Sequence, residues 1–286
     1  LCKIMKIDYF HYIESENKAY WLGFIVADGN ISKTTNRISI TLNSDDDYIL
    51  EDLKNELKCE NKIRRYLVFD KRTNKYNKSS VFQFSSKQLK EDLKLNGIDE
   101  NKSSNFDFDL ISKTKYFQHF LRGLFDGDGF ISGNKSRIML ISTKQFLSFI
   151  NNKMFSSKYM LQNITNNVYR LYVQNHWTCV DFLNYLYDNS SIFLKRKYER
   201  YLNLLKNNPV NVCRNRKLEV IDVYNNLKIF NSIKEFCENY NTDSGTIINL
   251  IKKNKTYKNM KLRRLEFEKV VKPIAYKSDF NLKELG

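Results

Sequence analysis

The sequence predicts an α+β protein built from two similar halves with antiparallel sheets and paired central helices, followed by a small helix-turn-helix domain. Three observations lead to this expectation. A helix-like segment occurs twice, 100 residues apart; strand-like and helix-like segments follow each copy in the same order; and the pattern changes after residue 207. We expect the first half over residues 1–110, the second over 111–206, a linker over 207–217, and the C-terminal module and tail over 218–286.

The repeated helix is marked by small residues at a spacing of four. The segments Trp21–Gly29 and Leu121–Gly129 share this pattern, which puts two small residues on one face of each helix. Small residues let two helices approach more closely than the usual ~8–10 Å between helix axes. We therefore expect the two copies to pack on each other through Gly23, Ala27, Gly123 and Gly127.

The first half continues with strands and helices in alternation. Arg37–Asn43 alternates apolar and polar residues, which predicts a half-buried strand, and Tyr48–Leu57 has apolar residues at helical spacing. Ile63–Phe69 and Val81–Ser85 predict a strand pair across a polar turn, and Lys87–Leu95 predicts a helix that ends at an Asn-Gly pair.

The second half repeats the same order of elements. Its expected strands are Arg137–Ser142, Met160–Ile164 and Val168–Gln174, and its expected helices are Lys144–Met154, Trp177–Tyr187 and Ile192–Leu205. In the C-terminal module, Leu218–Tyr224 alternates as a strand, a capping-box pattern begins a helix at Ser232, and a second helix is expected at about 244–253.

The composition indicates a basic, globular protein. Of the 286 residues, 48 are Lys or Arg and 32 are Asp or Glu, which gives a net charge of +16. The basic residues are interleaved with Tyr, Phe, Asn and Gln, which favours nucleic acid over a membrane as partner. No apolar run reaches the ~20 residues that span a bilayer, and residues 1–10 lack the features of a signal peptide. We therefore expect an intracellular, DNA-associated protein, in the cytoplasm or nucleoid, or in an organelle if the host is a eukaryote.

The cysteines and histidines limit the kinds of metal site that the chain can form. The five cysteines are scattered without a Cys-x-x-Cys pair, and the three histidines are not clustered. The sequence therefore predicts neither a disulfide framework nor a zinc site, and any metal is expected to be a hard cation held by carboxylates.

The ends of the repeated helices supply such carboxylates. Each helix is expected to end at an Asp-Gly pair with the glycine in a left-handed cap, and close packing would bring Asp28 and Asp128 side by side. Carboxylates at helix C-termini are disfavoured by the helix dipole and by each other. The arrangement predicts a bound cation, and paired carboxylates on a basic protein suit divalent metal and phosphodiester hydrolysis.

The two nine-residue segments resemble the LAGLIDADG motif of homing endonucleases, in the single-chain form that carries two motifs. The acidic eighth position is Asp28 in one copy and Asp128 in the other, whereas the sixth is Val26 in the first and Asp126 in the second. The resemblance implies two antiparallel sheets that form a saddle over double-stranded DNA, with the paired helices at its centre. It implies a monomeric, intron-encoded nuclease that cuts both strands across the minor groove of a long target site and leaves short 3′ overhangs.

The same resemblance implies the cofactor and the site residues. The metal is Mg²⁺, with Mn²⁺ or Ca²⁺ as substitutes, and family members carry a basic residue after the last strand of each repeat. Lys87 occupies that place in the first copy and His176 lies near it in the second, where a histidine that serves only in packing fits equally well. The implied metal set is Asp28, Asp128, Ala27 and Gly127, and the implied catalytic set is Asp28, Asp128, Lys87 and His176.

The alternating strands also predict how DNA is read. A sheet in the major groove would contact base edges with the polar side chains of one face, and the second helix of a helix-turn-helix would do the same. The expected contacts in the sheets are Arg37, Ser39, Thr41, Asn43, Arg64, Gln83, Arg137, Arg170, Tyr172 and Gln174. Those in the C-terminal module are Ser244, Thr246, Asn249, Lys252, Lys253 and Lys255. For each residue, a solvated sheet or helix face is the alternative.

Two other functions fit the same scaffold. An RNA maturase with intron RNA as partner, or a non-cleaving DNA-binding protein, would keep the fold without cutting. The two terminal aspartates argue against both, because a binder has no need of paired, mutually repelling carboxylates. An intein endonuclease domain is set aside, because the C-terminal dipeptide lacks the His-Asn pair of protein splicing.

Overall fold

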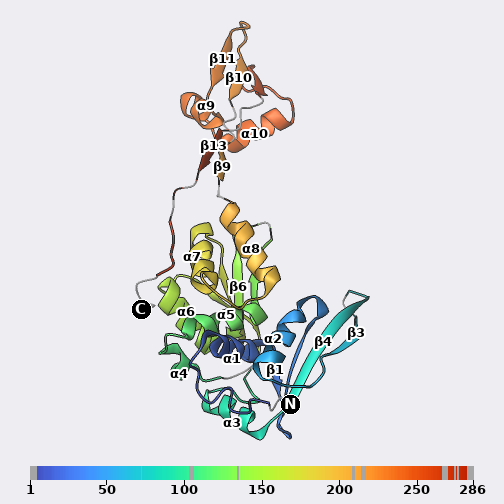
Figure 1. The fold of residues 1–286 in the computed structure, drawn as a ribbon. Coiled ribbons are helices and arrows are strands. Elements are labelled where there is room, and N and C mark those ends of the chain that lie inside the picture. Colours follow the sequence, from blue (N-terminus) through green and yellow to red (C-terminus); the bar gives the residue numbers. More distant parts are fainter. Residues whose placement is uncertain are drawn as a thin grey trace. The chain divides into compact units, whose positions relative to one another are not determined.

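The computed structural model describes residues 5–71, 73–102, 106–133, 135–207, 210–213, 217–265, 270–273, 275 and 277–281. The chain divides into two units (Figure 1). The core unit comprises Leu1–Asn207 and Tyr276–Gly286, and the C-terminal unit comprises Asn208–Ala275. The boundary after Asn207 coincides with the start of the expected linker, whereas the end of the chain belongs to the core unit and not to the C-terminal module.

The first repeat contains the helices and strands expected from the pattern, with a four-stranded antiparallel sheet in the order β1-β2-β4-β3. Strand β4 begins earlier than predicted, because polar residues 75–80 pair with β3 in an exposed hairpin. The elements are α1 (Glu16–Asp28), β1 (Gly29–Ile31), β2 (Arg37–Asn43), η1 (Ser44–Asp46), α2 (Tyr48–Glu56), β3 (Arg64–Asp70), β4 (Lys75–Ser85) and α3 (Lys87–Leu95).

The second repeat has a sheet of the equivalent order, β5-β6-β8-β7, also antiparallel. The predicted duplication of one α+β unit is therefore confirmed. The elements are α4 (Asp109–Ser112), α5 (Phe117–Asp128), β5 (Gly129–Ile131), β6 (Ile138–Thr143), α6 (Lys144–Phe155), β7 (Leu161–Thr165), β8 (Val168–Val173), α7 (His176–Tyr187) and α8 (Lys195–Lys206).

The two repeats share one hydrophobic core. Helices α1 and α5 lie side by side in the middle of the core unit (Figure 1). Trp21 and Phe24 of α1 and Leu121 and Leu124 of α5 are fully buried in a single apolar cluster that extends through both repeats. The paired helices are thus the structural centre on which both sheets are built.

The end of the chain packs on the second repeat of the core unit. The ring of Phe280 lies 6.0 Å from that of Phe155 and 5.9 Å from that of Tyr185. The carboxylate of Asp279 accepts a hydrogen bond from the Tyr159 hydroxyl at 3.0 Å, and its main-chain N–H donates to Thr178 at 2.8 Å. These contacts explain why the last residues belong to the core unit.

The C-terminal unit has its own small core. Helices α9 (Ile233–Tyr240) and α10 (Ser244–Lys252) pack with the three-stranded sheet β11-β10-β12 around a separate apolar cluster that includes Phe236 and Ile247. The predicted helix pair is present, but it belongs to an α+β unit. Four strands, β9, β11, β12 and β13, lie in segments for which none was predicted. The strands are β9 (Val210–Cys213), β10 (Leu218–Ile221), β11 (Leu227–Phe230), β12 (Lys261–Arg264) and β13 (Val270–Pro273), and β9 pairs with β13.

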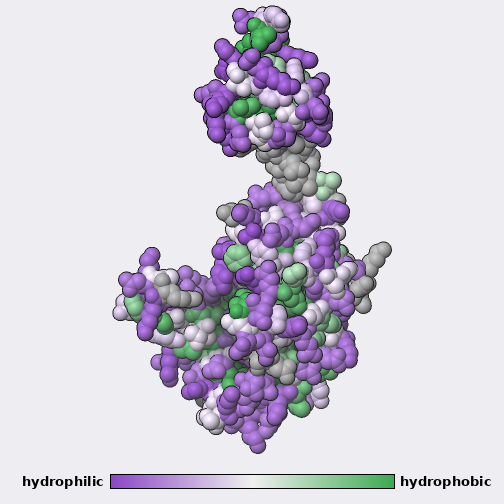
Figure 2. Space-filling view, turned by 180° about the vertical axis from the view of Figure 1, so that it is seen from behind, coloured by the Kyte–Doolittle hydropathy of each residue, from purple (hydrophilic) through white to green (hydrophobic). Residues whose placement is uncertain are grey.

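The surface is predominantly polar. On the face shown in Figure 2, hydrophilic residues dominate the surface of each unit, and small apolar patches lie among these residues. Within the described part of the chain, no helix has the length and apolar character needed to cross a membrane.

Candidate active site

The two central helices meet at their glycines. A Cβ atom built on Gly23 would lie 1.9 Å from the carbonyl oxygen of Phe120, and one built on Gly123 would lie 1.9 Å from that of Tyr20. Closer to the carboxyl ends, a Cβ on Gly127 would lie 2.3 Å from the Cβ of Ala27. The structure therefore brings all four small residues singled out in the sequence to one helix contact, where backbone packs directly on backbone.

Both helices end at the aspartate of the motif, and a strand begins at the next residue. The backbone of Gly29 has φ −71° and ψ 148°, and that of Gly129 has φ −88° and ψ 162°. The expected left-handed cap is therefore wrong, because the chain runs straight into β1 or β5. Glycine is needed at position 29 for a different reason, because a Cβ there would lie 2.5 Å from the carbonyl oxygen of Ile25.

Asp28 and Asp128 lie half-buried at these helix ends. Burial raises the pKa of Asp28 to about 6, and the negative charge of Asp128 adds to this shift. Burial also raises the pKa of Asp128. The environment thus disfavours the ionised carboxylates and favours the arrival of a further cation.

A buried lysine lies next to each helix end. The ammonium of Lys102, in the turn after α3, donates to the carbonyl oxygens of Val26 and Ala27 at 2.6 and 3.2 Å. The ammonium of Lys197, in α8, donates to those of Phe125 and Asp126 at 2.6 Å each. Each ammonium therefore caps the carboxyl end of a central helix, where the helix dipole favours positive charge. The two lysines also lower the pKa values of both aspartates, which limits the rise caused by burial.

The acidic residue at the sixth motif position has a structural role. Asp126 is fully buried, and its carboxylate accepts hydrogen bonds from the hydroxyls of Tyr20 at 2.9 Å and Tyr187 at 2.6 Å. It also accepts from the main-chain N–H of Leu194 at 2.8 Å. Its oxygens are thus occupied inside the core, and the equivalent Val26 of the first repeat is buried there as well.

Each sheet presents a polar face. In the first repeat, Ile38 and Ile40 face Phe84 and Phe82 on the buried side, so the intervening residues lie on the opposite side. That opposite face carries Arg37, Ser39, Thr41, Asn43, Arg64 and Gln83.

The second sheet has a comparable polar face beside β8. The guanidinium of Arg137, which precedes β6, lies 5.0 Å from the centre of the Tyr172 ring. Arg170 donates to the side chain of Gln162 at 2.7 Å, and Gln174 is exposed just after β8. The structure therefore groups the basic and amide side chains expected for DNA contact within each repeat.

No protein-family model matches the sequence, and no curated protein matches it either. Solved structures do resemble this protein. The homing endonuclease I-WcaI, bound to its DNA recognition sequence, matches 68% of this chain and 90% of its own with a TM-score of 0.50 and 15% identity. The core unit has the LAGLIDADG endonuclease fold. The LAGLIDADG meganuclease I-AabMI, bound to uncleaved DNA, matches with a TM-score of 0.42 and 14% identity over 65% of this chain and 88% of its own. Full-length DUF199/WhiA from Thermatoga maritima matches with a TM-score of 0.41 and 16% identity over 70% and 64%.

The donor atoms at the centre of this LAGLIDADG fold suit a hard divalent cation. In the described residues, no group of three or more His, Cys, Asp or Glu side chains could hold a metal ion. An ion at the helix ends would therefore rely on the two aspartates, with the other ligands from main-chain oxygen, water or substrate. Mg²⁺ accepts such a set, because it binds through one or two carboxylates and keeps several waters. The carbonyl oxygens of Ala27 and Gly127 already accept hydrogen bonds from Lys102 and Lys197 at 3.2 and 3.4 Å.

Two residues implied by the LAGLIDADG resemblance, Lys87 and His176, have other partners. The side chain of Lys87, at the start of α3, is 78% exposed and pairs with Glu91 at 3.6 Å. His176, at the start of α7, is buried, and its Nδ1 shares a 2.7 Å hydrogen bond with the hydroxyl of Ser136. Burial lowers the pKa of His176, which favours the neutral ring. The basic groups that act on the aspartate pair in the described structure are Lys102, Lys197 and Arg196.

Sequence reasoning missed the two lysines because no local motif marks them. Lys102 follows a helix in an irregular segment, and Lys197 belongs to a basic helix whose other lysines are exposed. The available signal was the duplication itself, because Lys102 and Lys197 follow the motif aspartates of their repeats by 74 and 69 residues.

The predicted contact residues of the C-terminal unit are exposed on α10 and on the segment after it. Ile247 is buried against the sheet, and Asp243 caps the helix by accepting from the N–H of Thr246 at 2.9 Å. The exposed residues of this helix and of the basic run after it are Ser244, Thr246, Asn249, Lys252, Lys253 and Lys255.

Proposed function

We propose that this protein is a metal-dependent endonuclease that cuts both strands of double-stranded DNA at a long, specific site. The observation that carries the proposal is the pair Asp28 and Asp128, two half-buried carboxylates at equivalent helix ends, each beside a buried lysine. A protein that only binds DNA gains nothing from this pair, because carboxylates repel phosphate groups. The likeness of the fold to that of I-WcaI, solved on its DNA recognition sequence, supports DNA as the partner.

The two aspartates would hold Mg²⁺ at the helix ends. When bound, the ion lowers the pKa of a coordinated water and stabilises charge on the scissile phosphate. Asp28 and Asp128 come from different repeats, so each half of the protein supplies one carboxylate to one strand of the duplex. This duplication supports cleavage of both strands, and short 3′ overhangs are the expected product.

We assign the electrostatic role first expected for Lys87 and His176 to Lys102 and Lys197. Burial lowers the pKa of Lys197 to about 8, so most of its amine remains protonated at neutral pH. Its hydrogen bonds to helix carbonyls fix the ammonium next to the carboxylates, where it requires no rearrangement to meet an approaching phosphate. Fixed charge of this kind in a partly dehydrated site stabilises a transition state more effectively than a mobile surface lysine does.

Cleavage of a randomised double-stranded DNA library with Mg²⁺, followed by sequencing of the ends, tests the function. We expect defined ends with short 3′ overhangs from the parent and none from Asp28→Asn or Asp128→Asn. Folded variants that cut as fast as the parent would refute the role of the pair. Tight retention of selected DNA or structured RNA without cutting would assign the protein to the binding or maturase class.

A lysine series tests the assignment of the basic residues. Lys102→Met and Lys197→Met remove the buried charges with little change in side-chain length, and Lys87→Met removes the exposed one. We expect the cleavage rate to fall by about 100-fold or more in Lys102→Met and Lys197→Met, which is the usual effect of losing one contact to the transition state. DNA affinity should not change. A larger loss of cleavage in Lys87→Met than in the other two variants would assign the electrostatic role to Lys87 instead.

We further propose that the C-terminal unit binds DNA through α10 and lengthens the recognised site. The exposed polar residues of α10 and the lysines after it support this proposal, because neutralised phosphates give affinity and a strong salt dependence. Replacing Lys252 and Lys253 by Ala should weaken binding uniformly across sequences and reduce the slope of log K against log salt by about two. An unchanged slope would exclude both lysines from the interface.

A further inference from the structure

The start of α8 connects the two repeats beside the candidate active site. Leu194, the N-cap residue, has no side-chain cap of its own, and its N–H donates to Asp126 at 2.8 Å. The N–H of Lys195, the first helical residue, donates to the hydroxyl of Tyr48 at 2.6 Å. Both N–H groups belong to the helix start, where intrahelical partners are missing. One partner comes from the second repeat and the other from α2 of the first repeat.

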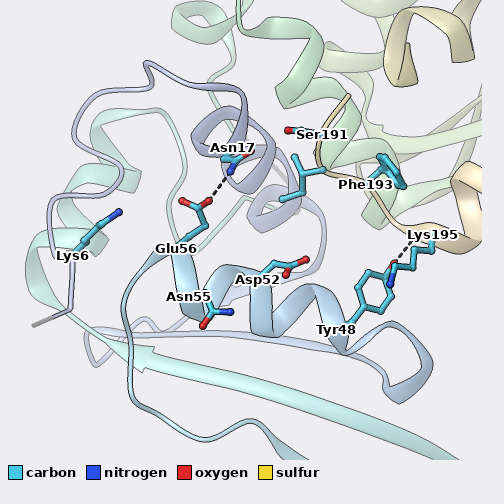
Figure 3. A pocket seen from close by; sticks show the side chains of 10 residues that line it. Lys6, Asn17, Tyr48, Asp52, Asn55, Glu56, Ser191, Phe193 and Lys195 are labelled. Atoms are coloured by element: carbon cyan, nitrogen blue, oxygen red, sulfur yellow. Dashed lines mark hydrogen bonds between the residues drawn. The ribbon is translucent and has the colours of Figure 1, made fainter. Parts of the chain in front are cut away.

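Side chains strengthen the connection to the first repeat. Figure 3 shows Tyr48 reaching from α2 to Lys195, whose ammonium lies 4.3 Å from the centre of the Tyr48 ring. The guanidinium of Arg196 donates to the carboxylate of Asp46 at 2.6 Å. Asp46 is only 5% exposed, so the carboxylate of this ion pair is held in place by the first repeat.

The next residue of the same helical turn is Lys197. Its side chain leaves the helix start and ends on the carbonyl oxygens at the end of α5, and the residue is only 2% exposed. Because residues 195–197 form one turn, a shift of the helix start moves the backbone of Lys197 with it. Asp46 and Tyr48 make the contacts that hold this turn against the first repeat.

We propose that Asp46 and Tyr48 are positioning residues for Lys197, so that the first repeat controls catalysis at the half-site of the second. The proposal rests on the proposed nuclease function and goes beyond it, because it makes the two half-sites unequal. Lys102, the equivalent lysine of the first repeat, lies in a turn and not at a helix start. The hydrogen bonds of its ammonium go to Val26 and Ala27 of its own repeat and involve neither Asp46 nor Tyr48.

Strand-specific nicking of an end-labelled target tests the proposal. Asp46→Ala and Tyr48→Phe should slow cleavage of one and the same strand by about 10- to 100-fold, the usual cost of removing a group that orients an active-site ligand. The matched control is Asp47→Ala, which removes the neighbouring ion pair to Arg65, also 2.6 Å long, without touching α8. The control should leave the ratio of the two strand rates unchanged. Equal slowing of both strands in the two test variants would overturn the proposal.

A second measurement does not depend on cleavage. Acylation of lysines by a water-soluble reagent, followed by mass spectrometry, reports how well each amine is protected. Labelling of Lys197 relative to Lys102 should rise several-fold in Asp46→Ala and in the milder Tyr48→Phe, and should not change in Asp47→Ala. Unchanged protection of Lys197 in both test variants refutes the positioning role, even for a protein that fails to cut DNA. Failure of the parent to cut, with Lys197 exposed in the variants, would refute only the nuclease function.

Discussion

Replacing Asp28 by Asn should stabilise the folded protein at neutral pH while it abolishes cleavage. The pKa of Asp28 is raised from 3.8 to about 6 by burial and by the charge of Asp128. A shift of one pKa unit corresponds to about 1.4 kcal/mol, so the ionised carboxylate costs the folded state up to about 3 kcal/mol. Partial exposure screens this cost, and we therefore expect a gain of about 2 kcal/mol in the free energy of unfolding.

The gain should depend on pH in a defined direction. Because the pKa is higher in the folded than in the unfolded protein, the folded state binds the proton more tightly. Below about pH 4 the carboxyl is protonated in both states and carries no penalty. Between about pH 4 and pH 6 the unfolded chain loses its proton first, so the stability of the parent falls, and above pH 6 the full penalty is present. The charged groups around Asp28 that shape this window are Asp128 on α5, Lys197 and Arg196 on α8, and Lys102 after α3.

Urea denaturation in EDTA at pH 4 and pH 8 measures the effect. Asp28→Asn should unfold at higher urea than the parent at pH 8 and at the same urea at pH 4, and Asp45→Asn, at an exposed aspartate, should match the parent at both. Mg²⁺ should then stabilise the parent and not the variant, since a ligand stabilises only the state that binds it. If the variant is no more stable than the parent at pH 8, burial does not raise the free energy of the ionised Asp28. If the variant exceeds the parent at pH 4 by as much as at pH 8, the gain does not come from the charge of Asp28.

Three further predictions concern the helix contact, the chain end and the charge. Gly123→Ala should lower the free energy of unfolding by about 3 kcal/mol or more in thermal melts, because the added Cβ would meet the carbonyl oxygen of Tyr20 at 1.9 Å. The control Gly133→Ala, whose added Cβ would have no atom within 4 Å, should be near neutral in the same melts. Phe280→Ala should cost about 2 kcal/mol for a half-buried ring and speed limited proteolysis near the C-terminus, whereas an unchanged cleavage pattern would mean that the end is held by other contacts. DNA affinity measured by fluorescence anisotropy should fall about 1,000-fold between 50 and 200 mM salt, and a weak dependence would contradict an interface dominated by phosphate contacts.

The fold could be predicted from the sequence because its determinants are local and occur twice. Alternation in Arg37–Asn43 and the four-residue spacing of small residues in α1 and α5 are periodic signals, and the order of elements in one half supports that in the other. The cap at Gly29 could not be predicted in the same way. An Asp-Gly pair at a helix end fits both a left-handed cap and direct entry into a strand, and the pairing of Gly29 with Ile40 decides between them.

The lysines of the site could not be predicted because their contacts are remote in sequence. Lys102 meets Val26 across 76 residues, and Lys197 meets Phe125 across 72. The resemblance supplied a basic residue by its place after a strand and so pointed to Lys87, whose side chain faces solvent. A residue's distance along the chain from a motif says little about its distance in space, and the packing of α8 against α7 and β5 brings the second lysine to the site.

The helix contact and the site cannot be varied independently. The separation of Asp28 and Asp128 follows from how closely α1 and α5 approach, and that approach is set where Gly23 and Gly123 meet backbone. A larger residue there would move both carboxylates apart as well as weaken the core. The proposed cleavage of both strands requires the two carboxylates to match the spacing of two phosphates, so the same two glycines would determine whether they can. The residues that make this fold stable are therefore also the residues that set the geometry of its proposed reaction.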